Sequence, residues 1–397
     1  MLKLKLKYFN DKILPAIVSR KFVVGLYILI AIITGFKQYY KGSFNNYKIF
    51  KYTYYHTINQ QPLYENYPQQ YDDSNHYGPV FGLVIAPFAL LPDFLGTTLW
   101  NIANALLLIF GIYSLPLTLI KRSVLGLLCA HEALGAMLSF QFNVGLTGLI
   151  LFSFSYLLKN QVGKSAIAIA LGTLIKVYGI LGLAFFFFTK RKMSFILYGI
   201  ISLVILIFLP TFLSSIDFTK QAYIDWYSSL VHKNDLNVSL TSGQDISLMG
   251  IIRRLLQNPN IPNLPFVIGG LILFLSPYLR INQYKNLAFR FMLLASSLIF
   301  VVIFSTGSES PTYIIAFTGV SIWFVLQDSP KLNWIVVLYI FAFILTSLSP
   351  SDIFPKYIRV NYVQHYSLKA LPCVMVWMVI IYQMLTADFK NYKINIE

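Results

Sequence analysis

The chain has 397 residues, of which 57% are hydrophobic and only 12% are charged. This composition excludes an ordinary soluble domain and indicates a polytopic membrane protein. The net charge of +16 does not indicate a nucleic-acid partner, because the lysines and arginines occur in short clusters between apolar runs. The two cysteines lie inside apolar segments, so we expect neither a disulfide framework nor a cysteine metal site.

The first 21 residues carry six lysines and arginines against a single Asp11. They lack a small-residue cleavage site before a short apolar core, so we expect a cytoplasmic leader and not a removed signal peptide. By the positive-inside rule the N-terminus is cytoplasmic and the polar segment 39–78 is extracytoplasmic. Within that segment, residues 45–64 predict an amphipathic helix that lies in the membrane interface.

Apolar segments follow one another along the rest of the chain, and a crossing needs about 20 largely apolar residues. We expect between eleven and thirteen crossings, packed as an all-α bundle that forms one transmembrane domain over residues 1–397. The candidate segments are 22–38, 79–92, 94–119, 123–139, 144–158, 165–189, 193–213, 262–279, 287–304, 311–326, 332–348 and 371–386.

Basic residues flank both ends of the segment 165–189, and a single crossing cannot place both flanks in the cytoplasm. We therefore expect this segment to break near Lys176 and Gly179 into two short helices that meet near the outer face. The Lys121–Arg122 pair raises the same conflict. Either the segment 79–92 is re-entrant or this pair violates the positive-inside rule.

With these choices, most of the polar sequence lies outside the membrane on one face. The outer loops are 39–78, 214–260, 305–312 and 349–370. A protein that only resides in a membrane does not need four elaborate loops on one side. The asymmetry therefore predicts an extracytoplasmic site.

The stretch "QQYDDSNHYGPVFG", residues 69–82, places Asp72 and Asp73 side by side just before an apolar run. Adjacent carboxylates repel each other, so a pair is costly unless cations or hydrogen-bond donors compensate it. A solvated turn is the ordinary explanation of such a pair. A catalytic carboxylate at the edge of the membrane is the functional one.

The sequence that follows this pair, and stretches further along the chain, resemble the polyprenyl-phosphate-dependent glycosyltransferases of family eighty-seven in the GT-C superfamily. The first large loop ends in a Tyr-x-Pro step and continues into an apolar, proline-containing run and a Leu-Trp-x-x-x-Asn helix. The matching positions are Tyr77, Pro79, Pro87, Leu90, Leu91, Pro92, Leu99, Trp100 and Asn104, followed by Gln141, Asn143 and Lys176. The resemblance extends over roughly residues 40 to 380.

This resemblance implies a GT-C-like bundle that moves a hexose, by family mannose, from a polyprenyl phosphate to an extracytoplasmic glycan or glycolipid acceptor with inversion. It implies a multi-pass protein of a bacterial inner or plasma membrane that contacts membrane lipids and no nucleic acid. Two departures stand out. Asn45 and Asn46 stand where members of the superfamily often carry an acid, and Gly179 replaces a proline. The first departure makes Asp73, then Asp72, our candidate for the base that deprotonates the acceptor hydroxyl.

Positive charges on the outer side run against the orientation bias and are candidates for binding the donor phosphate. The candidates are Arg253, Arg254, Lys356, Arg359 and Lys369, together with Lys176 in the apolar segment. Snorkelling toward lipid headgroups is the alternative for the outer cations. A lysine within the membrane is costly, so Lys176 should face protein or water, paired with the phosphate or with Glu132.

Further polar residues are candidates for contacts with the sugar or the acceptor. They are Glu65, His76, Tyr77, Gln141, Asn143 and Glu309. Glu309 is a possible second acid or a turn-capping residue. His131 and Glu132 are adjacent on one predicted helix and therefore point in different directions, as packing partners commonly do.

We expect no metal and no cofactor, because the five histidines share no ligand spacing and Asp72–Asp73 is not an Asp-x-Asp pair. No glycine-rich phosphate loop occurs either, which favours a lipid-linked donor over a nucleotide sugar. A transporter or flippase of lipid-linked sugars remains an alternative, as does a non-catalytic member of the same fold. A transporter would concentrate its ionisable residues near mid-membrane between repeated halves, whereas here most lie in outer loops.

Overall fold

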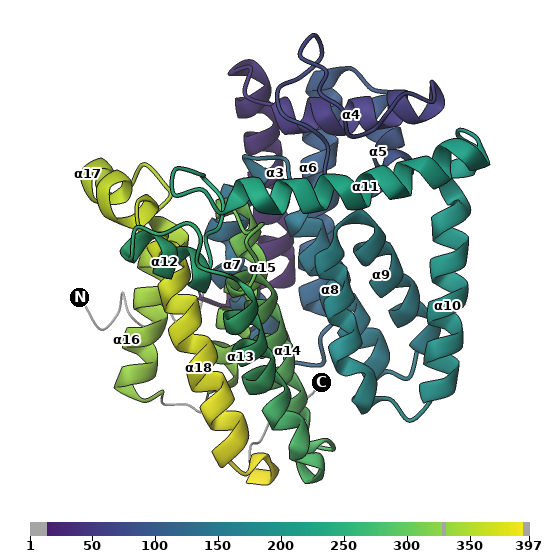
Figure 1. Cartoon of the computed structure of the whole chain (residues 1–397). Coiled ribbons are helices and arrows are strands. Elements are labelled where there is room, and N and C mark those ends of the chain that lie inside the picture. The colour runs from purple at the N-terminus through teal and green to yellow at the C-terminus, as the bar shows by residue number, and fades with distance from the viewer. Residues whose placement is uncertain (1–13, 328–330, 392–397) are drawn as a thin grey trace.

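The computed structural model describes residues 14–327 and 331–391, which contain helices and no strand (Figure 1). Four helices are long and apolar enough to cross a membrane: Arg20–Tyr40, Asp93–Ser114, Lys192–Phe212 and Leu368–Thr386. Seven shorter apolar helical segments accompany them in the described part of the chain. The prediction of an all-α polytopic membrane protein is confirmed.

The α-helices of the bundle are α2 Leu14–Ile17, α3 Arg20–Tyr40, α4 Asn45–Ile58, α5 Phe81–Ala89, α6 Asp93–Ser114, α7 Leu119–Met137, α8 Asn143–Leu158, α9 Val162–Ile175, α10 Lys192–Phe208, α11 Ile216–Asn237, α12 Leu248–Leu255, α13 Leu264–Leu275, α14 Leu287–Ile303, α15 Tyr313–Leu326, α16 Asn333–Ala342, α17 Lys356–Ile358 and α18 Leu371–Thr386. Short 3₁₀ segments are η2 Val177–Phe188, η3 Leu209–Phe212, η4 Ser276–Leu279, η5 Ile281–Gln283, η6 Ser310–Thr312, η9 Leu368–Ala370 and η10 Phe389–Asn391. Two π-helical segments, η7 Phe343–Leu348 and η8 Arg359–Gln364, complete the chain.

The core of the bundle is apolar and aromatic, and it buries three tryptophans whose indole N–H groups all have partners. Trp100 donates to Phe140 O at 2.7 Å, Trp323 to Gln383 at 2.9 Å and Trp377 to Ser296 at 3.0 Å. A tryptophan is rarely buried with its N–H unpaired, since an unsatisfied polar group away from water is costly. These contacts join helices that are far apart in sequence.

The segment 165–189 breaks at Lys176, as the charge pattern predicts. α9 ends at Ile175, Lys176 is extended, and η2 begins at Val177. Gly179 packs directly on the backbone of α9, because an ideal Cβ there would lie 2.2 Å from the carbonyl carbon of Gly172. η2 is a 3₁₀ helix with a rise of about 2.0 Å per residue, so its 12 residues extend about 24 Å. The α9–η2 hairpin therefore brings both basic flanks to the same end of the bundle.

Helices α4 and α11 lie across one end of the bundle, and α10 runs from the opposite end up to α11 (Figure 1). The predicted amphipathic helix forms as α4, but its apolar face, with Tyr47 and Phe50, is buried against protein. Lys51 pairs with Asp93 at 2.6 Å, and the Tyr47 hydroxyl donates to Phe88 O at 2.8 Å. These contacts attach α4 to α5 and α6.

Helix α5 has nine residues and extends only about 14 Å, which is too short to cross the hydrocarbon. Helix α5 lies against α4, because Gly82 approaches Thr57 and the carbonyls of Phe88 and Ala89 accept hydrogen bonds from Tyr47 and Tyr55. The chain then reaches Asp93 beside Lys51 of α4. The segment 79–92 therefore stays at the α4 end of the bundle and does not cross, so it shares with the re-entrant alternative only that both of its ends lie on one side. The Lys121–Arg122 pair then lies beyond α6, at the end of the bundle away from α4.

Candidate active site

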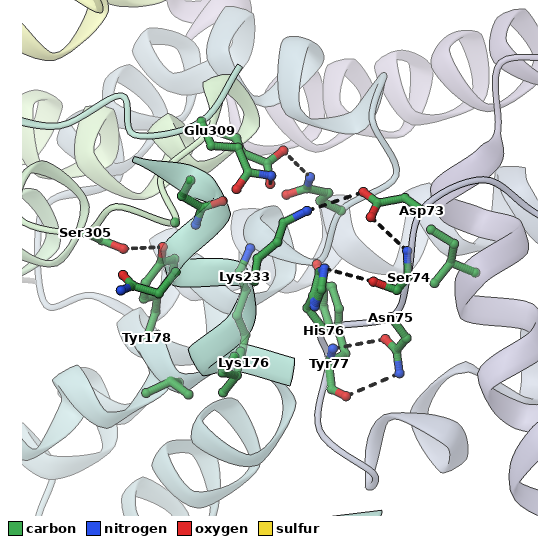
Figure 2. A pocket seen from close by; sticks show the side chains of 18 of the residues that line it. Asp73, Ser74, Asn75, His76, Tyr77, Lys176, Tyr178, Lys233, Ser305 and Glu309 are labelled. Carbon is green, nitrogen blue, oxygen red and sulfur yellow. Dashed lines mark hydrogen bonds and ion pairs between the residues drawn. The ribbon is translucent and has the colours of Figure 1, made fainter. Parts of the chain in front are cut away.

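A cavity of about 490 Å³, the central cavity, is lined by many polar side chains (Figure 2) and is bordered by α4 and α11. Its walls come from α4, the loop 73–77, the α9–η2 break, α11 and the loop 305–309. It brings together six of the residues that the sequence analysis singles out: Asp73, His76, Tyr77, Gln141, Lys176 and Glu309. Segments more than 200 residues apart in sequence thus meet at one site.

Asp73 is held by its own loop and by α11. Its φ of 69° is in the left-handed region, which asparagine and aspartate tolerate better than other side chains. Its Oδ1 accepts a hydrogen bond from Ser74 N at 2.8 Å, and its Oδ2 lies 3.5 Å from Lys233 Nζ. The carboxylate remains 60% exposed. It therefore faces an open cavity with a cation at its side.

The asparagines that replace the expected early acid lie beside this loop. Asn45 binds the backbone of Asp72 twice, because its Nδ2 donates to Asp72 O at 2.6 Å and its Oδ1 accepts from Asp72 N at 2.9 Å. Asn46 lines the central cavity. Asn45 therefore holds the loop that carries Asp73 in place.

The Tyr77–Gly78 step docks the loop onto the α9–η2 break. Gly78 N donates to Ile175 O at 3.1 Å, and an ideal Cβ on Gly78 would lie only 1.9 Å from Leu174 O. The Tyr77 hydroxyl accepts from Phe142 N at 3.1 Å, and the Lys176 ammonium lies 5.6 Å from the Tyr77 ring centroid. Only glycine permits this approach, which holds the end of the Asp73 loop against the residues that precede Lys176.

One face of α11 clamps the same loop from above. Trp226 Nε1 donates to His76 O at 3.0 Å, and Ser229 Oγ lies 2.9 Å from His76 Nδ1. Lys233 follows on this face and points toward Asp73 (Figure 2). Burial, assisted by the charge of Lys233, lowers the pKa of His76 to about 4. His76 is therefore neutral near pH 7.

The Gln-x-Asn stretch forms a relay between two charges. Lys176 Nζ donates to Asn143 Oδ1 at 2.8 Å, Asn143 Nδ2 donates to Gln141 Oε1 at 2.8 Å, and Gln141 Nε2 donates to Glu309 Oε2 at 2.9 Å. Each amide presents oxygen toward the ammonium and nitrogen toward the carboxylate, which is the only orientation that satisfies both ends. Within the described residues no carboxylate lies within 4 Å of the Lys176 ammonium. Its charge is free to meet an anion in the cavity.

A second cavity of about 740 Å³, the cationic cavity, adjoins the first through Gln244, which lines both. Arg254, Arg359 and Lys369 line it. Gln244 Nε2 donates to Glu309 Oε1 at 3.3 Å, so the shared wall is tied to the relay. Three of the predicted phosphate ligands therefore gather next to the central cavity and not in it.

Two of these cations, and the neighbouring Arg253, already have partners in the protein. Arg253 binds Asp245 at 2.6 Å and the carbonyl of Ile261. Arg254 donates to the carbonyls of Ser242, Gln244 and Asp245. Lys369 pairs with Glu132 at 2.7 Å and also donates to Ser310 Oγ at 3.1 Å. Arg359 differs, because its bonds to Ser351 O and Asp352 use only one of its terminal nitrogens.

Five predicted site residues line neither of these two cavities: Glu65, Asp72, Asn143, Arg253 and Lys356. Asp72 and Lys356 are exposed. Glu65 lines a separate cavity of about 600 Å³, on the other side of the Asp73 loop. Asn143 is buried and reaches the site only through the relay. His131 bonds Ser347, while Glu132 forms the ion pair with Lys369.

The sequence analysis missed Lys233, Gln244 and Tyr178, which all line the central cavity. Lys233 lies in a helix rich in charged residues, so its charge alone does not indicate a functional role. Its spacing of seven from Trp226 on α11 is the one pattern that indicates a shared face. Among residues 14–327 and 331–391, no group of three or more histidine, cysteine, aspartate or glutamate side chains has a geometry that holds a metal ion.

The fold and site define a multi-pass, all-helical membrane protein with a charged polar cavity under the loops at one end of its bundle. The model of glycosyltransferase family 87 matches residues 75–306, which is more than half of the chain. The chain belongs to this family and is a membrane glycosyltransferase of the GT-C type. No curated protein matches it at a significant level. The family decides for a transferase over the transporter alternative.

Proposed function

We propose that the enzyme transfers a hexose, mannose by the family resemblance, from a polyprenyl phosphate to a glycan or lipid acceptor outside the membrane, with inversion. The observation that carries this proposal is the central cavity, which combines the carboxylate of Asp73 with the buried ammonium of Lys176. The first suits a base and the second suits a departing phosphate.

The reaction forms one bond and breaks one bond at the anomeric carbon. The acceptor oxygen attacks this carbon while its proton passes to Asp73, and the bond from the anomeric carbon to the phosphate oxygen breaks. The electron pair leaves with the phosphate, which remains attached to its carrier as a monoester. Inversion requires the acceptor and the phosphate on opposite faces of the sugar. Gln141 and Gln244 hold the Glu309 carboxylate in place, and we assign it to bind hydroxyl groups of the transferred sugar.

Lys176 is the residue to which we assign the donor phosphate. It lies in the same cavity as Asp73 and its direct partners are neutral, namely Asn143 and the rings of Tyr77 and Tyr178. An ammonium withdrawn from water gains most when an anion arrives beside it. Protein groups already occupy Arg253, Arg254 and Lys369, so we assign these three cations a structural role in the loops around the site. Arg359 is the alternative phosphate ligand, and it lies in the cationic cavity.

An apolar groove of about 480 Å³ supports a lipid-linked donor. It lies between α9, η2 and α10, and its lining includes Thr173, Ile180, Phe186 and Ile200. Thr173 precedes Lys176 by three residues and Ile180 follows it by four, so one hairpin carries both the groove and the ammonium. A carrier chain in this groove would place its phosphate at Lys176. A soluble nucleotide-sugar donor has no apolar chain that would bind in such a groove.

The orientation of the protein follows from charge in this proposal. The basic turns 159–164 and 190–192 lie at the end of the bundle away from α11, and the loops with the central cavity lie at the other (Figure 1). By the positive-inside rule the basic end is cytoplasmic. The central cavity is then extracytoplasmic. Labelling single cysteines from outside sealed cells tests this, because position 191 should be protected and position 235 should be labelled.

The test of the reaction is radiolabelled transfer in proteoliposomes with a polyprenyl-phosphate mannose donor. Asp73→Asn should lower turnover at least about 10²-fold, and the matched Asp72→Asn should not. Lys176→Met should raise the donor KM about tenfold or more, whereas Arg359→Met should leave it within about twofold. If the two cation variants exchange these results, the phosphate binds in the cationic cavity. Activity in Asp73→Asn near that of the wild type would refute the assignment of the base.

A further inference from the structure

A cavity of about 600 Å³, the α11 cavity, opens on the far side of the Asp73 loop from the central cavity. Four residues line both cavities and form the wall between them: Asp73, Ser74, His76 and Lys233. The rest of the α11 cavity comes from the chain after α4, around Glu65, and from an adjacent strip of α11 around Asp225. The two cavities thus meet at the proposed base.

We propose that the α11 cavity binds the acceptor, and that the acceptor unit it holds is an electrically neutral sugar. This rests on the proposed function, in which Asp73 removes the proton of the acceptor hydroxyl. A base must touch the acceptor oxygen, and in an inverting transfer that oxygen approaches the sugar from the face opposite the phosphate. The Asp73 side chain borders both cavities, so a hydroxyl entering from the α11 cavity meets the carboxylate before it meets the donor.

The charge of the α11 cavity selects against an anionic acceptor unit. Its lining carries the carboxylates of Glu65, Asp73 and Asp225 against one lysine, Lys233, whose ammonium is already 3.5 Å from Asp73, and two histidines, His76 and His232. His76 adds no charge near pH 7, because burial lowers its pKa to about 4. Two carboxylates therefore remain without a lysine or arginine partner in the lining of the cavity. A uronic acid or a phosphate placed here would face like charges, which disfavours the wrong partner strongly.

The same carboxylates suit the hydroxyl groups of a neutral sugar. Within the described residues Glu65 makes no hydrogen bond or ion pair, and Asp225 accepts one bond, from Gln221 Nε2 at 2.8 Å. Their free oxygens accept hydrogen bonds, and sugar hydroxyls donate them. Bonds to an ionised acceptor are shorter and stronger than neutral ones. The hydroxyl of Ser228 and the amide of Asn66 add neutral contacts at the border of the cavity.

The test compares glycosides that differ only in charge, and it needs no donor. The full-length protein in zwitterionic lipid nanodiscs is titrated with methyl glucoside and methyl glucuronide, and with the matched galactose and mannose pairs, while saturation-transfer NMR reports binding. We expect at least one neutral glycoside to bind about tenfold or more tightly than its uronide. The double variant Glu65→Gln/Asp225→Asn should reduce this preference to within about threefold, which is less than 1 kcal/mol of discrimination. Glu65→Gln alone, at an exposed position, should reduce it in part and guards against misfolding of the double variant.

The control is Asp217→Asn, which removes a carboxylate from α11 outside the cavity and should leave the preference unchanged. Asp73→Asn should still bind neutral glycosides while losing transfer, so a failure of the proposed base is separable from a failure of the acceptor site. Equal or tighter binding of the uronides by the wild type overturns the proposal. So does an unchanged preference in the double variant, or the absence of any binding at about 10 mM glycoside, a concentration suited to millimolar dissociation constants.

Discussion

Replacing Gly78 with alanine should lower turnover even at temperatures where the protein remains folded, because this glycine lets the Asp73 loop approach the end of α9. The new Cβ would lie 1.9 Å from Leu174 O and 3.1 Å from the Trp226 ring, and real Cβ contacts are essentially never shorter than 3.0 Å. The loop must therefore move by about 1 Å away from α9. A displacement of about 1 Å at reacting groups costs about 10²-fold in rate. The loss of the Gly78 N–H bond to Ile175 O and the crowding together cost about 2–4 kcal/mol of stability.

The assay pairs transfer in proteoliposomes with thermal unfolding in detergent. We expect turnover to fall about 10²-fold at temperatures where the Gly78→Ala protein is still folded, with Tm lowered by several degrees. Gly135→Ala is the matched control, because an ideal Cβ at that exposed position meets nothing within 4 Å. It should retain turnover and Tm. Wild-type turnover in Gly78→Ala would refute the argument that the docking of this loop onto the α9–η2 break positions Asp73 against Lys176.

Three further predictions follow from buried polar contacts. Glu132→Gln leaves the buried Lys369 ammonium without its carboxylate and should lower the unfolding free energy by about 3–5 kcal/mol, and Glu132→Gln/Lys369→Met should recover much of the lost Tm. Asn143→Leu interrupts the relay from Lys176 and should raise the donor KM about tenfold in steady-state transfer, more than it changes Tm. The pKa of His76 is lowered to about 4 in the folded protein, so the unfolded chain binds more protons below pH 6.5. The Tm of the wild type should therefore fall between pH 6.5 and 4 more steeply than that of His76→Gln, and parallel curves would contradict the assigned burial.

Much of the central cavity is predictable from sequence because the membrane makes polar residues conspicuous. Gln141, Asn143 and Lys176 interrupt apolar runs, where a polar side chain is costly unless it has a partner. The structure joins these three to Glu309 in one relay. Lys233 does not stand out from its neighbours in this way, because it lies in a helix in which charged residues are common. Its place beside Asp73 depends on how α11 crosses the bundle, which no local pattern encodes.

The cations predicted to bind the donor phosphate show what the positive-inside rule cannot predict. Positive charges on the outer side predict an anionic ligand only if the protein supplies no partner of its own. Asp245 and Ile261 O hold Arg253, and Glu132, 237 residues away in sequence, holds Lys369. Backbone carbonyls carry no sequence signature, so partners of this kind are invisible before the fold is known. Arg359 is the outer arginine whose remaining donors face a cavity, which is why it serves as the rival ligand in the donor experiment.

The shared walls of the cavities suggest an order for the reaction. Asp73 lies between the α11 cavity and the central cavity, and the α9–η2 hairpin carries both Lys176 of the central cavity and part of the lining of the apolar groove. An acceptor and a membrane-anchored donor would then reach the central cavity by different routes. Because the Gly78 contact joins the Asp73 loop directly to the end of α9, the two routes are held at a fixed separation. An in-line displacement needs this constraint, since the attacking oxygen and the leaving phosphate must lie on opposite faces of one sugar.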